Sequence, residues 1–271
     1  MMFIRTVTAL ILSLLAASSA LSQVPASKEE ARIIEATAIL NEWQQMSDQG
    51  IPDRLLDRAQ AIAIFPSVIK GAFIFGGRFG RGVVLVKDLN GRWSDPSFLT
   101  VAGGSWGLQI GAQSSDLILI FTTRKGIEGL SGGKVTIGGD ISGAVGPVGR
   151  QLSGSTDLSF SAEVYSYSRA KGLFAGIALD GSSMSIDYSA NAKYYGQSDL
   201  LASDIFAGKV KSEPATAQAL IQAVGRLAHT TAQAGPSMKG NVLTPQPTQK
   251  NVEERGLEST STTTFPISNQ R

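Results

Sequence analysis

Apolar residues recur with helical spacing near the start of the chain. Ser27 followed by Glu30 is typical of a capping box, in which two side chains accept hydrogen bonds from free backbone N–H groups at a helix start. The apolar residues that follow are spaced by three or four positions: Ile33, Ala36, Ile39, Leu40, Trp43 and Met46. This spacing predicts an amphipathic helix over residues 28–47. Pro52, which the first turn of a helix tolerates, indicates a short second helix over residues 52–60.

The pattern changes to alternation between residues 71 and 196, a stretch that holds 24 of the 30 glycines. Apolar segments of strand character occupy residues 72–75, 83–87, 106–112, 117–122, 135–145, 158–164 and 173–179. With short turns between them, these segments predict an antiparallel β-sheet, and residues 77–81 are expected to form the turn of its first hairpin. Glycine inside strands indicates strong bends or closely packed layers, as in a barrel-like sheet or a coiled sandwich.

A further amphipathic helix is predicted over residues 212–232, where apolar residues again recur at helical spacing. Residues 236–271 are rich in Thr, Ser, Pro, Gln and Asn and have too few apolar side chains to form a core, so we expect a disordered tail. The expected fold class is α+β. A glycine-rich antiparallel sheet would pack with an N-terminal and a C-terminal amphipathic helix in a single domain over residues 23–235.

The first 22 residues have the features of a cleavable export signal. Arg5 precedes an apolar stretch over residues 7–17, and small residues then end in Ala20-Leu21-Ser22, which fits cleavage after Ser22. The apolar stretch is shorter than the roughly 20 residues of a membrane-spanning helix, which argues against a retained anchor. The chain has no cysteine that could carry a lipid. We therefore expect a mature protein in a bacterial periplasm.

Charge and composition exclude several classes of function. The 24 Lys and Arg residues against 22 Asp and Glu residues give a net charge of +2, so the chain has no cationic excess with which to displace counterions from nucleic acid. Cysteine is absent and there is one histidine, His229, which excludes disulfides, thiolate nucleophiles and metal sites built from several imidazoles of one chain. We expect no metal, no cofactor and no nucleic-acid partner.

Two matches to the Gly-x-Ser-x-Gly pattern of serine hydrolases occur, at residues 103–107 and 129–133. In a hydrolase this serine lies on a tight turn between a strand and a helix, where it meets a histidine base. Here each match is followed by a segment with strand alternation, and His229 on the last predicted helix is the only histidine. A serine hydrolase is therefore a remote alternative, and we predict no catalytic residue.

Basic residues near aromatic ones carry the main functional signal. In the first group, Arg78 and Arg81 flank Phe79 at the predicted hairpin turn, and Lys70 lies just before the preceding strand. The second group consists of Arg169 and Lys171, which precede a Gly-Leu-Phe segment. Such groups suit an anionic lipid surface, because the charges meet phosphate while the ring enters the interface. The candidate lipid-binding residues are Lys70, Arg78, Phe79, Arg81, Arg169 and Lys171. The alternative is a solvated turn whose Phe79 folds onto the core.

Four segments, in order and with matching spacing, resemble a SYLF domain, also called the Ysc-type actin-binding domain. They are IPDRLLDRAQAIAIFPSVIKGAFIFGGRFGRGVVLVKDLNGRWSDPSF (51–98), GLQIGAQSSDLILI (107–120), GPVGRQ (146–151) and YSYSRAKGLFAGIALDG (165–181). The resemblance runs over about residues 31–206. It implies a lipid-binding domain without enzymatic activity, and actin-filament binding as in the yeast members.

Two features of this chain modify what the resemblance implies. In animal members a basic amphipathic N-terminal helix binds membranes, whereas residues 28–46 here have two basic and four acidic side chains, a net charge of −2. Such a helix is repelled by anionic lipid, so we expect it to dock on the sheet instead. An exported bacterial protein would not ordinarily meet actin. The expected partner is therefore an anionic phospholipid or membrane surface of the cell envelope, and the alternative is a scaffold that binds other envelope proteins.

Overall fold

The computed structural model describes residues 25–45, 51–72, 76–105, 111–148, 161–170, 173–210 and 214–233. The predicted export signal, the predicted tail and the candidate residue Lys171 lie outside these ranges. Within the ranges, no helix combines the length and the apolar character needed to cross a bilayer.

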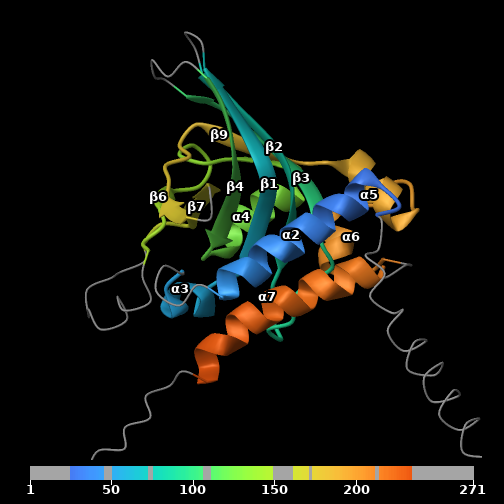
Figure 1. Ribbon diagram of the computed structural model, residues 1–271. Coiled ribbons are helices and arrows are strands. Elements are labelled where there is room, and N and C mark those ends of the chain that lie inside the picture. Colours follow the sequence, from blue (N-terminus) through green and yellow to red (C-terminus); the bar gives the residue numbers. More distant parts are fainter. Residues whose placement is uncertain are drawn as a thin grey trace, which may run out of the picture. The chain divides into compact units, whose positions relative to one another are not determined.

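Nine strands of the described residues form one strongly curled sheet, a half-barrel (Figure 1). The strands are β1 (Ala61–Ala72), β2 (Gly76–Val86), β3 (Ser97–Ser105), β4 (Gly111–Phe121), β5 (Lys134–Thr136), β6 (Gly143–Val145), β7 (Val164–Ala170), β8 (Leu173–Gly176) and β9 (Ser182–Ile186). Their order is β5-β9-β3-β2-β1-β4-β7-β6, with β8 also paired to β7. All of these pairs are antiparallel except β6 with β7.

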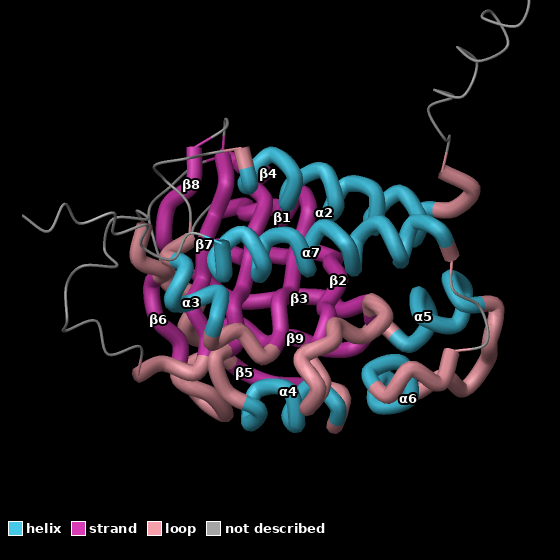
Figure 2. Tube along the Cα trace, turned by 90° about the horizontal axis from the view of Figure 1, so that it is seen from below, coloured by secondary structure: helices cyan, strands magenta, loops and turns pink. Residues whose placement is uncertain are grey.

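The helices pack on both faces of this sheet. They are α2 (Lys28–Gln44), α3 (Asp53–Asp57), α4 (Arg124–Ser131), α5 (Tyr188–Tyr195), α6 (Ala202–Phe206) and α7 (Ala215–Gln233). The two long helices, α2 and α7, lie side by side across one face, here called the helix-covered face (Figures 1 and 2). The short helix α4 packs against β5 and β9 on the other side, here called the opposite face.

Alternation along the strands supplies a hydrophobic core to each face. In β1, Ile62 and Ile64 join the core formed with α2 and α7. Their neighbours Ala61, Ala63 and Phe65 join the core that includes the apolar side chains of α4. Burial on both faces explains why this part of the strand is apolar at every position. The predicted α+β fold, a curled glycine-rich sheet with flanking helices, is confirmed.

The predicted N-terminal helix is confirmed as α2. The Ser27 hydroxyl accepts a hydrogen bond from the Glu30 N–H at 3.0 Å, and the Glu30 carboxylate accepts one from the Ala26 N–H at 2.6 Å. The helix docks on the sheet, as expected from its charge. Trp43 is 1% exposed and stacks on Phe174 of β8 with the ring centroids 4.7 Å apart.

The predicted turn at residues 77–81 is wrong, because these residues lie inside β2. The pairing of β1 with β2 begins at Ala72 with Gly76, which places the connection at residues 73–75, outside the described residues. Gly80, one of the two glycines that suggest this turn, serves close packing instead. A Cβ atom added to Gly80 would lie 2.6 Å from Cγ2 of Val68.

Other differences also lie in the glycine-rich region. The predicted first strand over residues 72–75 overlaps β1 only at Ala72, and residues 73–75 lie outside the described residues, so β1 itself is not predicted. The alternation pattern also does not predict β3, α4, β9, α5 and α6. The predicted strand over residues 135–145 is two short strands, β5 and β6, joined by a turn. Of the strand predicted at residues 158–164, residues 158–160 lie outside the described residues, and the observed strand, β7, begins only at Val164. Of the strand predicted at residues 106–112, residues 106–110 lie outside the described residues.

Candidate functional site

The central strands continue past the helices that cover the sheet. β1, β2 and β4 contain 12, 11 and 11 residues, and the far ends of β1 and β2 extend beyond α2 and α7 (Figure 1). We call residues 68–71, 76–82, 100–104 and 113–115 the distal sheet. It contains three cationic residues, Lys70, Arg78 and Arg81, and no carboxylate. Positive charge is therefore concentrated at this end of the sheet.

A β-bulge in β1 separates the distal sheet from the rest. Between the pairs Ile64–Val83 and Ile69–Phe79, β1 advances five residues while β2 advances four. The extra residue is accommodated next to Ser67, whose φ of 56° lies in the left-handed region. A bulge of one residue reverses the alternation of all side chains that follow it.

The bulge is held in place by a side chain of β4. The backbone N–H of Ser67 donates a hydrogen bond to Oδ1 of Asp116 at 3.0 Å. Beyond the bulge, Val68 belongs to the core of the opposite face, and Lys70 lies on that face with it. Ile69 consequently lies on the helix-covered face, past the end of its helices.

Strand register sorts the candidate residues onto two faces. Lys70 is paired directly with Arg78 on the opposite face, and Ile69 is paired with Phe79 on the helix-covered face. Ile69 and Phe79 are 58% and 49% exposed. The guanidinium carbon of Arg81 lies 5.9 Å from the centroid of the Phe79 ring, within the range of a cation–π contact. The amino-acid sequence does not reveal Ile69 as a member of this group, because its pairing with Phe79 depends on the strand register.

On the opposite face, Lys70 and Arg78 line a cleft of about 410 Å³. Apolar and polar side chains of β1, β4 and β7 and of the segment after β8 complete its wall: Val68, Gln113, Ser115, Leu117, Ser168, Ile177 and Leu179. No carboxylate among the described residues lines it. The cleft therefore combines two cations with hydrogen-bonding side chains and an apolar wall.

The guanidinium of Arg78 is half-buried in this cleft. Its Nη1 donates a hydrogen bond to the backbone carbonyl of Ala178 at 3.2 Å. Its Nε is buried and has no hydrogen-bond partner. Burial lowers the pKa of Arg78 from its ordinary value, since it disfavours the charged form, but an arginine remains protonated at neutral pH.

Arg169 is not part of this group. Its Nε donates to Oδ2 of Asp116 at 2.8 Å, and its Nη1 pairs with the carboxylate of Glu42 on α2. The Arg169 side chain is 18% exposed. The structure thus places it in an ion-pair cluster that joins the sheet to a helix, on the face away from Lys70 and Arg78.

The serine motifs do not form a nucleophile site within the described residues. Ser131 is the last residue of α4, and its hydroxyl donates to the carbonyl of Ile127 at 3.0 Å. Ser105 ends β3, and the two motif residues after it lie outside the described residues. A hydrolase serine would instead precede a helix, on a turn that follows a strand.

The chain is similar to a family model and to animal proteins that share the Ysc84 name. Residues 102–227 match the family model of Ysc84, described as a Las17-binding protein actin regulator. The chain is 39% identical over 189 residues to SH3 domain-containing YSC84-like protein 1 of Xenopus laevis, covering 68% of this chain and 56% of the relative. The human protein of the same name is 37% identical over 201 residues, covering 72% of this chain and 57% of the relative.

A yeast relative is similar over a shorter range. LAS seventeen-binding protein 3 of Saccharomyces cerevisiae strain S288c is 36% identical over 172 residues, which cover 62% of this chain and 37% of the relative. The aligned region thus spans little more than half the length of the animal relatives and about a third of the yeast one.

Proposed function

Because the chain belongs to the Ysc84 family, in which the SYLF domain is the shared unit, we propose that it is a non-enzymatic module that binds anionic phospholipid membranes through its distal sheet. The observation that carries the proposal is the exposed cross-strand pair of Ile69 and Phe79 beside Arg81. Large apolar side chains gathered at the end of a sheet and flanked by cations suit the boundary between lipid head groups and acyl chains.

The apolar and electrostatic contributions to such binding are of similar size. Full burial of a large apolar side chain contributes about 1.5–3 kcal/mol, and Ile69 and Phe79 expose roughly half of their surfaces. Each basic residue near an anionic membrane adds about 1 kcal/mol. Neither contribution alone gives strong attachment, so binding should require both the apolar pair and anionic lipid.

The helix α2 is a poor alternative membrane contact. Its apolar side chains Ile33, Leu40 and Trp43 are buried against the rest of the domain. Two acidic residues, Glu29 and Glu30, lie in its first turn, and its last turn has no basic residue. Membrane binding through this helix would require it to leave the sheet.

Vesicle co-sedimentation of the full chain tests the proposal. Vesicles of phosphatidylcholine alone and of phosphatidylcholine with phosphatidylglycerol would be compared for the wild type and for Ile69→Ser with Phe79→Ser. We expect binding only to the anionic vesicles and its loss in the double variant. The matched control is Leu89→Ser, since Leu89 is 89% exposed but lies outside the distal sheet. Equal binding of the double variant and the wild type would refute the proposal.

A second candidate function is binding to a protein partner. The family model is described as a Las17-binding actin regulator, and the yeast relative is named for the same partner. Co-sedimentation with actin filaments, in the absence of lipid, tests this alternative. Binding to filaments that survives Ile69→Ser with Phe79→Ser would favour it.

We also propose that the protein acts in the periplasm of a bacterial envelope, on the basis of the signal-like residues 1–22. N-terminal sequencing of the protein recovered from a periplasmic fraction should begin at Gln23. Recovery of a full-length chain from the cytoplasmic fraction would contradict this location.

A further inference from the structure

We infer that the cleft between Lys70 and Arg78 is a binding site for a phosphate group. The inference deepens the proposed function and rests on it only where the phosphate is that of a lipid. The described lining of the cleft carries positive charge without a compensating carboxylate. Lys70 and Arg78 are directly paired across β1 and β2 on one face, and like charges in that position are destabilising unless an anion lies between them. No carboxylate among the described residues lines the cleft.

The Arg78 guanidinium is only partly satisfied by hydrogen bonds. Its Nη1 is fixed by the Ala178 carbonyl at 3.2 Å, whereas its buried Nε has no partner. Leaving a buried donor unpaired is unfavourable, and an anionic oxygen would remove that penalty with a charge-assisted hydrogen bond. A planar guanidinium held at one nitrogen presents its other N–H groups in the fork geometry that matches phosphate.

Neutral polar side chains and an apolar wall complete the lining of the cleft. Gln113 is the neighbour of Lys70 on β4, and Ser115 and Ser168 add hydroxyl groups. These side chains can donate to further phosphate oxygens, while Val68 and Leu117 give the cleft an apolar wall. A volume of about 410 Å³ accommodates a phosphate together with a small attached group. Two cations facing one space fit the charge of phosphate better than that of a single carboxylate.

The phosphate site and the apolar pair can be tested separately, because they lie on different faces of the distal sheet. The test measures binding of inorganic phosphate, glycerol 3-phosphate and acetate to the full chain, by NMR titration or calorimetry. Lys70→Gln and Arg78→Gln should each weaken binding of both phosphate compounds about tenfold, as expected for loss of a charge-assisted hydrogen bond. The matched control is Lys134→Gln on β5, whose side chain is exposed outside the cleft.

Two further variants define the outcome. Arg78→Lys keeps the charge but removes the fork, so it should also weaken phosphate binding if the guanidinium contacts two oxygens. If Arg78→Gln fails to fold, Lys70→Gln still tests the site, because the Lys70 side chain is only partly buried and is replaced by one of similar length.

The source of the phosphate follows from vesicle binding. If soluble glycerol phosphate competes with anionic vesicles and Lys70→Gln weakens both, the ligand is a lipid head group. If the vesicles bind Lys70→Gln as they bind the wild type, the site takes a soluble phosphate compound. Acetate binding as tightly as phosphate, or no phosphate binding by the wild type, would overturn the inference. Failure of the membrane proposal is recognised separately, by unchanged vesicle binding of Ile69→Ser with Phe79→Ser.

Discussion

Arg169 donates from its Nε to Oδ2 of Asp116 at 2.8 Å, and the other oxygen of the same carboxylate accepts the N–H of Ser67 at the bulge of β1. The Arg169 guanidinium also pairs with Glu42 of α2. One arginine therefore connects β7, the β4 residue that holds the bulge, and the helix that covers the sheet. This role is structural, whereas the sequence alone suggests a lipid contact.

Arg169→Met should lower the free energy of unfolding by about 3 kcal/mol, because it leaves the largely buried carboxylate of Asp116 without its cation. Burial already raises the pKa of Asp116 above its ordinary value. Urea denaturation measures the effect. In Glu42→Gln the loss should stay below about 1 kcal/mol, since the Glu42 side chain is 55% exposed. Full stability of Arg169→Met combined with lost vesicle binding would instead make Arg169 a lipid contact.

Gly82→Ala should destabilise the domain by about 1–3 kcal/mol, as overpacking does. A Cβ atom at this position would lie 2.3 Å from the carbonyl oxygen of Ile64 and 2.6 Å from Cδ1 of Phe65. The control is Gly104→Ala, where a Cβ atom would meet nothing within 4 Å. Thermal unfolding of both variants measures the difference. Equal melting temperatures would show that β1 and β2 can separate without loss of stability.

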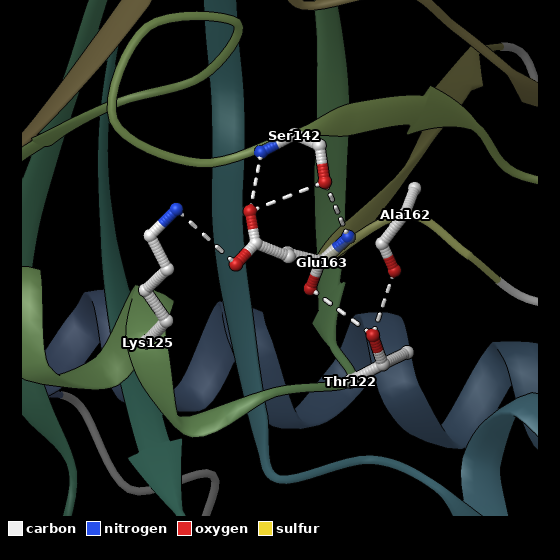
Figure 3. Close-up of polar contacts among 5 residues, drawn as sticks. All are labelled: Thr122, Lys125, Ser142, Ala162 and Glu163. Atoms are coloured by element: carbon white, nitrogen blue, oxygen red, sulfur yellow. Dashed lines mark hydrogen bonds and ion pairs between the residues drawn. The ribbon is translucent and has the colours of Figure 1, made fainter.

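Glu163, whose carboxylate contacts Ser142 and Lys125 (Figure 3), should contribute to the acid sensitivity of the fold. The Ser142 N–H donates to Oε2 of Glu163 at 2.7 Å, and this hydrogen bond holds the pKa of Glu163 below its ordinary value. Lys125 lies 3.6 Å from the other oxygen. A depressed pKa means that the folded state favours the ionised form. The stabilisation is therefore present above the unfolded pKa of about 4.3 and is lost as the pH falls through the lower folded value.

Glu163→Gln should accordingly be less stable than the wild type at pH 7, and the difference should shrink as the pH falls below about 4. Urea unfolding of both proteins over pH 3–7 measures it. Glu128→Gln is a suitable control, because Glu128 is exposed on α4 in the same region. A difference between Glu163→Gln and wild type that does not change with pH would contradict the role of the ionised carboxylate.

Arg81→Glu should weaken binding to anionic vesicles more than tenfold at low salt. The substitution removes an attraction to the membrane of about 1 kcal/mol and adds a repulsion of about the same size. The effect should diminish as salt is added, because exposed charges are screened. Phe79→Ala should weaken binding without changing the salt dependence. Arg92→Glu, at an exposed residue outside the distal sheet, tests whether net charge alone is responsible. An equal loss in Arg92→Glu would contradict a localised contact.

Local patterns predict the two long helices, α2 and α7, better than the short helices and the glycine-rich strands. The capping residues and apolar spacing of α2 are set by its own sequence, so its start at Lys28 follows from it. The short helix α4 was not predicted, because its glycines look like breaks in a helix. Their reason lies elsewhere in the chain: a Cβ atom at Gly126 would meet the Phe121 ring at 2.8 Å, and one at Gly129 would meet Val135 at 3.1 Å.

The candidate site was predicted as a list of residues but not as an arrangement. Lys70 and Arg78 lie together in the structure, as their predicted grouping suggests, whereas Phe79 and Arg81 lie on the other face. The face of each residue depends on a bulge that apolar alternation does not reveal, because a single added residue reverses the pattern. The partner of Arg169 depends on the pairing of β4 with β7, which is equally non-local.

The extra residue of β1 near Ser67 is absorbed by the bulge, so the residue pairs beyond it keep the register of an uninterrupted β-ladder. Deleting that residue would remove the bulge and leave Lys70 opposite Arg78 in the cleft and Ile69 opposite Phe79 on the helix-covered face. A one-residue change of length that no bulge absorbs would instead exchange the two sides of the distal sheet. Alignment gaps near Ser67 would therefore be compatible with both surfaces, whereas gaps elsewhere in β1 would mark a change in the chemistry of each side.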